Sequence, residues 1–475
     1  MLTRLVIALL LFVSTTSTFD AKSPATNSKQ SLINIAKSAD LIASKYNQMG
    51  WFSGSVLLAK DGDVFFIKSY DNKSLIKSTK NSKHTKYNLG SIAKNFTKVL
   101  VLQQIESGTL RLNDSIDKFN LGFPKEISSK VTVESLLNHS SGFADIFTAE
   151  YRENQLAFDT LEKKLQLLQS QPLLFEPGTE HRYSNYGYIV LGSILERVTN
   201  LTFEQLLKRE IFDRIDLKWT AFKVNPADKY QSTRYAYLYD DSIKEVGIVE
   251  HPGPDGGIES NVQDVQKFYR ELFYGDRLLN HSNPMVVKSF AMNGKHWSAY
   301  GGGLGVSAAV EVNLAQGFEV IVLANTDNLV AERISQRVNA FINEGAYQAI
   351  KPLEINFAYR FYKQQGKEIF YESFRKKYEE NGYKIFIGRT VNELGMQLLR
   401  THSWDQAFDI FNYLIAIFPG APEAYDSLAF AYLTKGEPSQ AQKVFKKALA
   451  INADFKSDYV KSNYLYSSNT KATKY

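Results

Sequence analysis

A serine and a lysine lie three residues apart in the segment 91–94 (SIAK), directly after Gly90. Apolar residues recur behind them at helical spacing, which predicts a helix over 91–107. On such a helix the two side chains share one face. A serine hydroxyl becomes a nucleophile when a neighbouring base takes its proton, and a lysine is one group that does so. The spacing of Ser91 and Lys94 therefore indicates nucleophilic chemistry.

The same pair has a simpler interpretation, because serine and lysine are common residues. In that interpretation Ser91 is an ordinary residue at the start of a helix and Lys94 is solvated. The motif alone does not separate the two interpretations, and a second feature is needed.

A second polar pair follows a Pro-Gly loop. Residues 175–179 (FEPGT) lead to Tyr183 and Asn185, and a helix is predicted over 186–199. Side chains at a loop-to-helix junction are well displayed for catalysis. Beside Lys94, Tyr183 would both give and accept a proton, with Asn185 hydrogen-bonded to the lysine. The alternative is a tyrosine packed on the core and an asparagine in a turn.

Taken together, the motifs resemble those of the serine β-lactamase-related family. This family includes class C β-lactamases, penicillin-binding D-alanyl-D-alanine peptidases and family VIII esterases. The resemblance covers roughly residues 35–345. The stretches that carry it, in the family's order, are Ser91-x-x-Lys94, 136–142 (LLNHSSG), Tyr183-x-Asn185, 256–260 (GGIES) with Asp264, and 302–306 (GGLGV) before 323–325 (LAN).

The resemblance implies roles for the matched residues. These are Ser91 as nucleophile, Lys94 as activating base, Tyr183 as proton shuttle and Asn185 as a supporting residue that also lines the substrate site. An oxyanion hole would use the backbone N–H of Ser91 and one from an edge strand near Gly303, which would also contact substrate. His139 is expected to be structural.

The third motif of the family is altered in this chain. The family usually has Lys or His, a small residue and Gly on the edge strand, whereas the aligned residues here are Tyr300-Gly301-Gly302. The neighbouring Lys295-His296 does not precede a suitable glycine. Tyr300 is expected to bind substrate, but tyrosine brings no positive charge. This weakens the β-lactamase and carboxypeptidase interpretations and leaves neutral esters or amides open.

Two hairpins are predicted far apart in the chain, over 54–70 and 306–323. We therefore expect an α+β fold, in which helices flank one antiparallel sheet and a large helical insertion interrupts it. The β-lactamase-related domain is expected over residues 30–348. Helix candidates in the insertion, besides 91–107 and 186–199, are 155–169 and 203–212.

A helical tail is expected after this domain. Residues 349–385 are predicted to form a helical linker, and 386–460 contain an internal repeat. Equivalent positions recur after 34 residues: Leu394 and Leu428, Gly395 and Ala429, Ala407 and Ala441, Phe411 and Phe445. This is the tetratricopeptide period, and the two repeats are expected either to dock on the preceding helices or to act as a small module that recruits a protein partner. Two unrelated amphipathic hairpins are the alternative.

The N-terminus has the pattern of a signal peptide over residues 1–21. Arg4 precedes an apolar run over 5–13, followed by serine and threonine. The run is short for a membrane span, although a membrane anchor or a buried start is the alternative. We expect an exported protein, periplasmic or secreted.

Composition excludes several classes of site. The chain has no cysteine, which excludes disulfides and thiolate ligands, and none of its 7 histidines forms an H-x-x-x-H pair. No metal and no cofactor is expected. A net charge of +6 over 475 residues is mild, and there is no long basic run, so nucleic-acid binding is not expected.

The predicted function is hydrolysis through an acyl-enzyme on Ser91. The substrate would be a small molecule or peptide containing an ester, an amide or a D-amino-acid peptide bond. Esterase or peptidase activity is favoured over efficient β-lactam hydrolysis. The alternative is a catalytically weak protein that binds cell wall or peptide, with repeats that recruit a protein partner.

Overall fold

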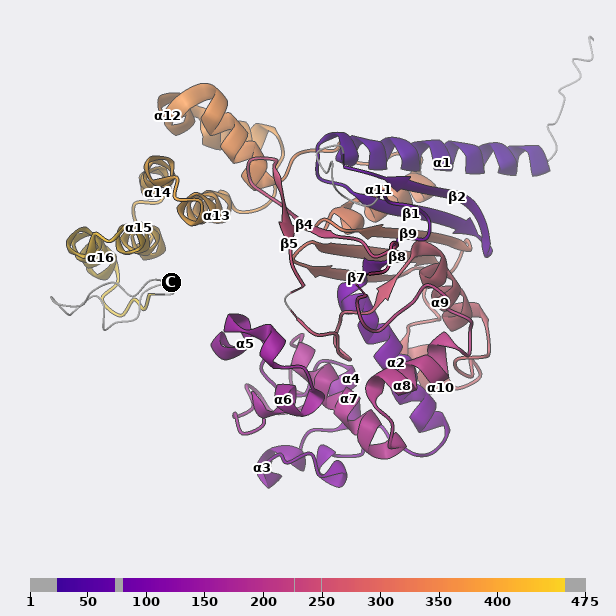
Figure 1. Cartoon of the computed structure of the whole chain (residues 1–475). Coiled ribbons are helices and arrows are strands. Elements are labelled where there is room, and N and C mark those ends of the chain that lie inside the picture. The colour runs from indigo at the N-terminus through magenta and orange to yellow at the C-terminus, as the bar shows by residue number, and fades with distance from the viewer. Residues whose placement is uncertain (1–23, 73–79, 226, 249, 458–475) are drawn as a thin grey trace, which may run out of the picture.

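The computed structural model describes residues 24–72, 80–225, 227–248 and 250–457. The predicted signal peptide, residues 1–21, lies outside the described residues. Figure 1 shows the main sheet between two helical layers, with a further group of helices to one side.

The main sheet is antiparallel and has the strand order β2–β1–β9–β8–β7. Both predicted hairpins are confirmed. In the first, Asp61 and Gly62 have φ values of 52° and 93°, the left-handed pair that suits a tight hairpin turn. The strands are β1 (Gly54–Lys60), β2 (Asp63–Tyr70), β7 (Trp297–Gly303), β8 (Val306–Asn313) and β9 (Phe318–Ala324).

Both faces of this sheet are buried, which explains why its inner strands are mostly apolar. On β9, Ile321 faces the helices of the insertion, whereas Val322 faces α1 (Pro24–Gln48) and α11 (Val330–Glu344). Successive side chains on a strand point to opposite faces, so each face has its own core. Figure 1 shows α1 and α11 on one side of the sheet and the insertion on the other.

The insertion lies between β2 and β7 and is mostly helical, as expected. Its helices are α2 (Ala93–Glu106), α3 (Lys125–Ser128), α4 (Val133–Leu137), α5 (Ala149–Glu153), α6 (Leu161–Gln166), α7 (Asn185–Thr199), α8 (Phe203–Leu207), α9 (Val262–Tyr274) and α10 (Pro284–Ser289). Its short strands are β3 (Tyr87–Asn88), β4 (Arg234–Tyr237), β5 (Ile243–Val246) and β6 (Glu259–Ser260).

The structure differs from the predicted helices in three places. The helix predicted over 91–107 starts as a 3₁₀ turn over Gly90–Ile92, and α2 begins at Ala93. The segment 155–169 is divided into the short turn Gln155–Ala157 and α6, because the Thr160 side chain caps α6 by accepting from the backbone N–H of Lys163 at 3.2 Å. The segment 203–212 is α8 followed by a π-helical turn.

The C-terminal region is all-helical. Its helices are α12 (Glu354–Glu380), α13 (Ile387–Arg400), α14 (Trp404–Ile417), α15 (Pro422–Lys435) and α16 (Pro438–Ile451). Phe370 and Phe374 of α12 share one buried core with Leu394 and Phe411. Aromatic residues of the predicted helical linker over 349–385 thus pack in the core of the helices that follow.

The repeat positions are occupied equivalently in two successive helix pairs. Ala407 and Ala441 are both fully buried, and Phe411 and Phe445 are also buried. This agrees with the spacing in the sequence, while the tetratricopeptide assignment stays a prediction.

The β4–β5 hairpin links the two regions. Its connecting turn carries Asp241, which accepts hydrogen bonds from Arg360 at 2.5 Å and Asn356 at 2.9 Å. Tyr239 of the same turn is hydrogen-bonded to Thr401 of the C-terminal region at 3.0 Å. Figure 1 shows this hairpin between the sheet and α12–α13.

A search for membrane-spanning helices among the described residues finds none with the length and apolarity that a bilayer requires.

We predict that Phe411→Ala lowers the free energy of unfolding of the C-terminal helices by about 3–5 kcal/mol, because it leaves a cavity in their shared core. Chemical denaturation followed by tryptophan fluorescence measures this, with Trp404 as the local probe. Phe386→Ala is the matched control, since Phe386 is 64% exposed. Equal effects of the two substitutions would contradict the assigned core.

Candidate active site

Ser91 lies where the backbone leaves β3 and enters α2. Asn88 ends β3, and its side-chain oxygen accepts the backbone N–H of Gly90 at 2.8 Å. Gly90 has φ +51°, and a Cβ there would lie 2.8 Å from the backbone nitrogen of Gly302. Only glycine tolerates both the left-handed conformation and this close approach. The result is a tight turn that brings Ser91 against strand β7.

The Ser91 hydroxyl is flanked by two titratable side chains. Tyr183 Oη donates to Ser91 Oγ at 2.7 Å, and Lys94 Nζ donates to the same oxygen at 3.2 Å. Lys94 Nζ also lies 5.0 Å from the centre of the Tyr183 ring. The structure thus brings together the three side chains that were predicted to be catalytic, within the distances that proton transfer requires.

Lys94 is held by neutral oxygens. Its ammonium donates to Asn185 Oδ1 at 2.7 Å and also to the backbone carbonyl of Asp255, and the side chain is only 4% exposed. Within the described residues, Lys94 forms no ion pair with a carboxylate. These contacts hold the nitrogen within hydrogen-bond reach of Ser91 Oγ.

Asn185 is oriented by Asp145, a residue that sequence analysis missed. Asp145 Oδ1 accepts the backbone N–H of Asn185 at 2.9 Å, and Oδ2 accepts its side-chain amide at 3.1 Å. Because the amide nitrogen is engaged there, the amide oxygen faces Lys94. The available signal was a carboxylate just after the matched segment 136–142, placed where it meets the N-terminus of α7.

His139 supports Tyr183 from behind. Its ring stacks on the Tyr183 ring, with centroids 4.5 Å apart, and Nδ1 accepts the backbone N–H of Ser184 at 3.3 Å. Burial, followed by the nearby charge of Lys94, lowers the pKa of His139 to about 4. The imidazole is therefore neutral at pH 7. The geometry fits the expected structural role, and that role stays a prediction.

Tyr300 is not where it was expected. Its hydroxyl donates to Glu311 at 2.5 Å and its ring packs in the core beside α11, on the face of the sheet opposite the insertion. Burial, together with this bond, raises the pKa of Tyr300 to about 12. Ala299 faces the insertion instead. The expectation that Tyr300 binds substrate is therefore wrong, because the strand presents its neighbour to that face.

The register of β7 and β8 bears on the second oxyanion donor. Gly303 pairs with Val306 at the turn between the two strands. The N–H groups of successive residues on an edge strand alternate between the neighbouring strand and the outer side. Gly302 is solvent-exposed, and its nitrogen lies against Gly90, next to Ser91. We therefore expect the backbone N–H groups of Ser91 and Gly302 to form the oxyanion hole, and the role expected for Gly303 stays a prediction.

The family model described as Beta-lactamase matches residues 39–342, more than half of the chain. The chain belongs to the Beta-lactamase family. This confirms the resemblance inferred from the motifs, and the shared fold is that of serine hydrolases.

Similar proteins agree with this family. A penicillin-binding protein of Bacillus subtilis (strain 168) is 26% identical over 272 residues, which cover 53% of this chain and 59% of that protein. A penicillin-binding protein from Bacillus halodurans has a similar structure, with TM-score 0.55, 23% identity and coverage of 65% of this chain and 98% of that one. The D-amino acid amidase from Ochrobactrum anthropi SV3 has TM-score 0.55, 18% identity and coverage of 66% and 99%. The chain thus spans less than two thirds of the curated B. subtilis relative's length.

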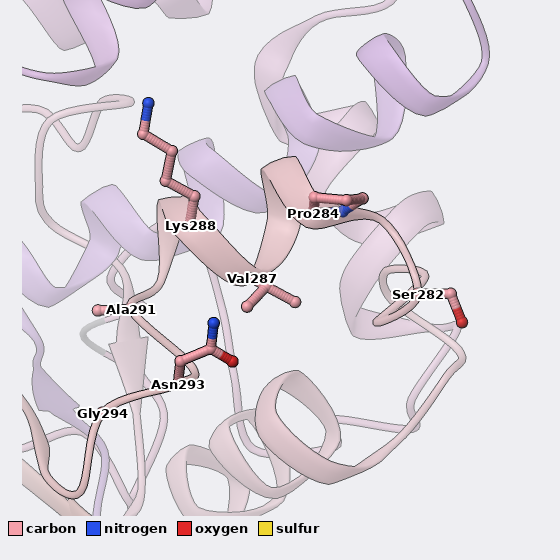
Figure 2. A pocket seen from close by; sticks show the side chains of 7 residues that line it. All are labelled: Ser282, Pro284, Val287, Lys288, Ala291, Asn293 and Gly294. Atoms are coloured by element: carbon pink, nitrogen blue, oxygen red, sulfur yellow. The ribbon is translucent and has the colours of Figure 1, made fainter.

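A hollow of about 620 Å³ lies beside α10, apart from this Beta-lactamase-family site. Figure 2 shows that Val287 and Asn293 point into the same region, whereas Lys288 projects from the opposite side of the helix. None of the residues that line the hollow belongs to the Ser91 cluster. The convergent polar groups around Ser91, and not this hollow, mark the candidate active site.

We predict that protonation of His139 destabilises the fold. Since its pKa is lowered from 6.5 to about 4, its stabilising contribution is complete above pH 6.5 and is lost as the pH falls towards 4. The difference in unfolding free energy between wild type and His139→Asn should therefore narrow as the pH falls from 7 to 4.5. Urea denaturation at several pH values measures this difference.

The control is His402→Asn, because His402 also has positive φ, 56°, but is exposed in the C-terminal region. Asparagine tolerates this conformation at both positions. A constant difference between wild type and His139→Asn over the pH range would show that His139 is not held neutral by the fold.

Proposed function

We propose that this protein is an exported serine hydrolase that forms an acyl-enzyme on Ser91. The observation that carries the proposal is the position of the Ser91 hydroxyl, 2.7 Å from Tyr183 Oη and 3.2 Å from Lys94 Nζ. Such a nucleophile–base contact is what covalent catalysis by serine requires. Export is proposed from the signal-peptide pattern over residues 1–21.

Acylation begins when the Ser91 proton passes to Lys94 Nζ in its neutral form. Ser91 Oγ then bonds to the substrate carbonyl carbon, and the negative charge on the carbonyl oxygen is stabilised by the N–H groups of Ser91 and Gly302. As the intermediate collapses, Tyr183 Oη gives its proton to the leaving oxygen or nitrogen. The proton on Lys94 returns to Tyr183, so the three side chains are ready for the next step.

Deacylation follows the same path with water as the nucleophile. Water gives a proton to Lys94 and attacks the acyl carbon, and the oxyanion occupies the same two N–H groups. The bond from the acyl carbon to Ser91 Oγ then breaks, and Oγ recovers a proton through Tyr183. The free acid is released and the enzyme is unchanged.

The substrate class follows from the edge strand. Strand β7, from Trp297 to Gly303, contains no lysine, arginine or histidine, and Ala299 occupies the inward-facing position. A substrate carboxylate therefore has no cationic partner on this strand, which disfavours efficient β-lactam hydrolysis. We propose a neutral ester, an amide or a D-amino-acid peptide bond, and the amidase among the similar structures supports an amide.

The alternative is a binding protein with weak catalysis, favoured by the same missing cation. In this case the site would hold a cell-wall fragment or peptide, and the C-terminal helices would recruit a protein partner. The two functions are separated by whether Ser91 reacts.

We predict that a fluorophosphonate adds covalently to wild type and not to Ser91→Ala, because only an activated serine is phosphonylated. Intact-mass measurement after incubation checks this, with a penicillin tested in parallel. Ser91→Ala should nearly keep its thermal stability, since the hydroxyl is bonded only within the site, to Tyr183 and Lys94, and Lys94 keeps its two other acceptors.

The matched control is Ser107→Ala, at the exposed end of the same helix. It should label like wild type. Labelling by the fluorophosphonate alone supports an esterase or amidase, and labelling by penicillin as well shows that the site accepts a carboxylate-bearing peptide analogue. If neither reagent adds to Ser91, the hydrolase proposal is wrong and the binding-protein function is favoured.

A further inference from the structure

A fully buried carboxylate lies close behind the nucleophile, and the mechanism does not use it. Glu259 on β6 is 0% exposed and does not touch Ser91, Lys94 or Tyr183. Its Oε1 accepts from Asn88 at 2.9 Å and from Arg234 at 2.8 Å, and its Oε2 accepts from Gln231 at 2.9 Å. Both oxygens are therefore satisfied.

This arrangement is weakly explained by stability alone. Burying a carboxylate and a guanidinium carries a large desolvation cost, and apolar residues of the same volume often stabilise a protein equally well. The side chain of Arg234 is itself only 9% exposed. The hydrogen bonds made by the partners of Glu259 indicate a second role for this carboxylate.

Glu259 fixes the orientation of one amide. Asn88 gives its side-chain nitrogen to Glu259 and uses its side-chain oxygen to accept the backbone N–H of Gly90 at 2.8 Å. An ionised carboxylate only accepts hydrogen bonds, so it selects the amide nitrogen of Asn88. If the Asn88 amide were reversed, its oxygen would face the Glu259 carboxylate and its nitrogen would face the Gly90 N–H. Neither hydrogen bond would then form. The carboxylate therefore orients Asn88 so that its side-chain oxygen accepts the Gly90 N–H.

Gly90 is the residue on which the oxyanion hole depends. It precedes Ser91, has φ +51°, and approaches the backbone nitrogen of Gly302 so closely that a Cβ would lie 2.8 Å from it. A rotation of the Gly90 peptide would therefore displace the N–H of Ser91 from the N–H of Gly302. Misplacement of a catalytic group by about 1 Å can lower the rate about a hundredfold.

We propose that Glu259 is a positioning residue that, through Asn88, sets the Gly90 turn and so aligns the N–H groups of Ser91 and Gly302 on the developing oxyanion. The proposal rests on the proposed function for its catalytic meaning. Arg234 neutralises the buried charge that this task requires.

The first test is Asn88→Ala, which removes the connection and leaves the Arg234–Glu259 pair in place. With p-nitrophenyl acetate as the probe, kcat should fall about tenfold to hundredfold while KM stays within twofold of wild type, because alignment acts on the transition state. Amide hydrogen exchange over residues 88–92 should be faster than in wild type, and exchange in the sheet should be unchanged.

Asn95→Ala is the matched control. Asn95 is on α2 and bonds Tyr269 at 2.8 Å, with no contact to Gly90, so kcat should stay near the wild-type value. Wild-type kcat and wild-type exchange in Asn88→Ala would overturn the positioning role. A wild type that does not react with a fluorophosphonate would overturn the proposed function instead, so the two failures are distinguishable.

A charge-swapped pair keeps the test decisive if Asn88→Ala does not fold. Asn88→Asp alone sets two carboxylates against each other, and kcat should fall. Adding Glu259→Gln sets an amide donor against the new carboxylate at position 88, which still accepts the Gly90 N–H. Arg234 loses its acceptor at position 259 but lies close to the new carboxylate, because Arg234 and Asn88 both bond Glu259 Oε1 in wild type. The kcat of the double variant should therefore recover severalfold from that of Asn88→Asp. A double variant as slow as Asn88→Asp would overturn the proposal.

Discussion

The contact between the Gly90 turn and the edge strand β7 is the constraint on which the site depends. A Cβ at Gly301 would lie 2.0 Å from the Leu89 carbonyl oxygen, and one at Gly90 would lie 2.8 Å from the Gly302 nitrogen. Two backbones therefore meet with no side chain between them. This contact joins the insertion, which carries Ser91, to the sheet, which carries the second oxyanion donor. Buried side chains cover both faces of the sheet, and this packing fixes β7 at its contact with the Gly90 turn.

The second constraint is the burial of Lys94, which has no carboxylate partner among the described residues. Its nitrogen is held by the Asn185 amide oxygen and a backbone carbonyl, and aromatic rings of Tyr183 and Tyr188 lie within 5.7 Å. The carbonyl dipoles and the ring faces orient the nitrogen in the site. The carboxylate of Asp145 bonds Asn185 and not Lys94. There it orients Asn185 at the start of α7. Lys94 is thus oriented by an amide that a carboxylate holds in place, and not by the carboxylate itself.

Local sequence patterns singled out Ser91, Lys94 and Tyr183, and the resemblance to the family implied that they act together. Sequence reasoning failed at Tyr300. Strand residues alternate faces, so an alignment error of a single position sends a side chain to the wrong side of the sheet. Asp145 carried no periodic signal, and only the tertiary fold brings it to Asn185. Residues 349–385 could be predicted to be helical, but the sequence did not show which later helices their aromatic residues contact.

The C-terminal helices and the nucleophile are connected through one hairpin. Arg234 of β4 pairs with Glu259, which sets the Gly90 turn through Asn88. A Cβ at Gly305, in the turn after β7, would lie 2.7 Å from Arg234 Cβ. The other end of the β4–β5 hairpin is tied to α12 by the ion pair of Asp241 and Arg360. The β4–β5 hairpin thus contacts α12 at its turn, and at its strands it contacts both the support of the nucleophile and the turn after the edge strand. The C-terminal helices therefore pack against the element that supports the site, without lining the site themselves.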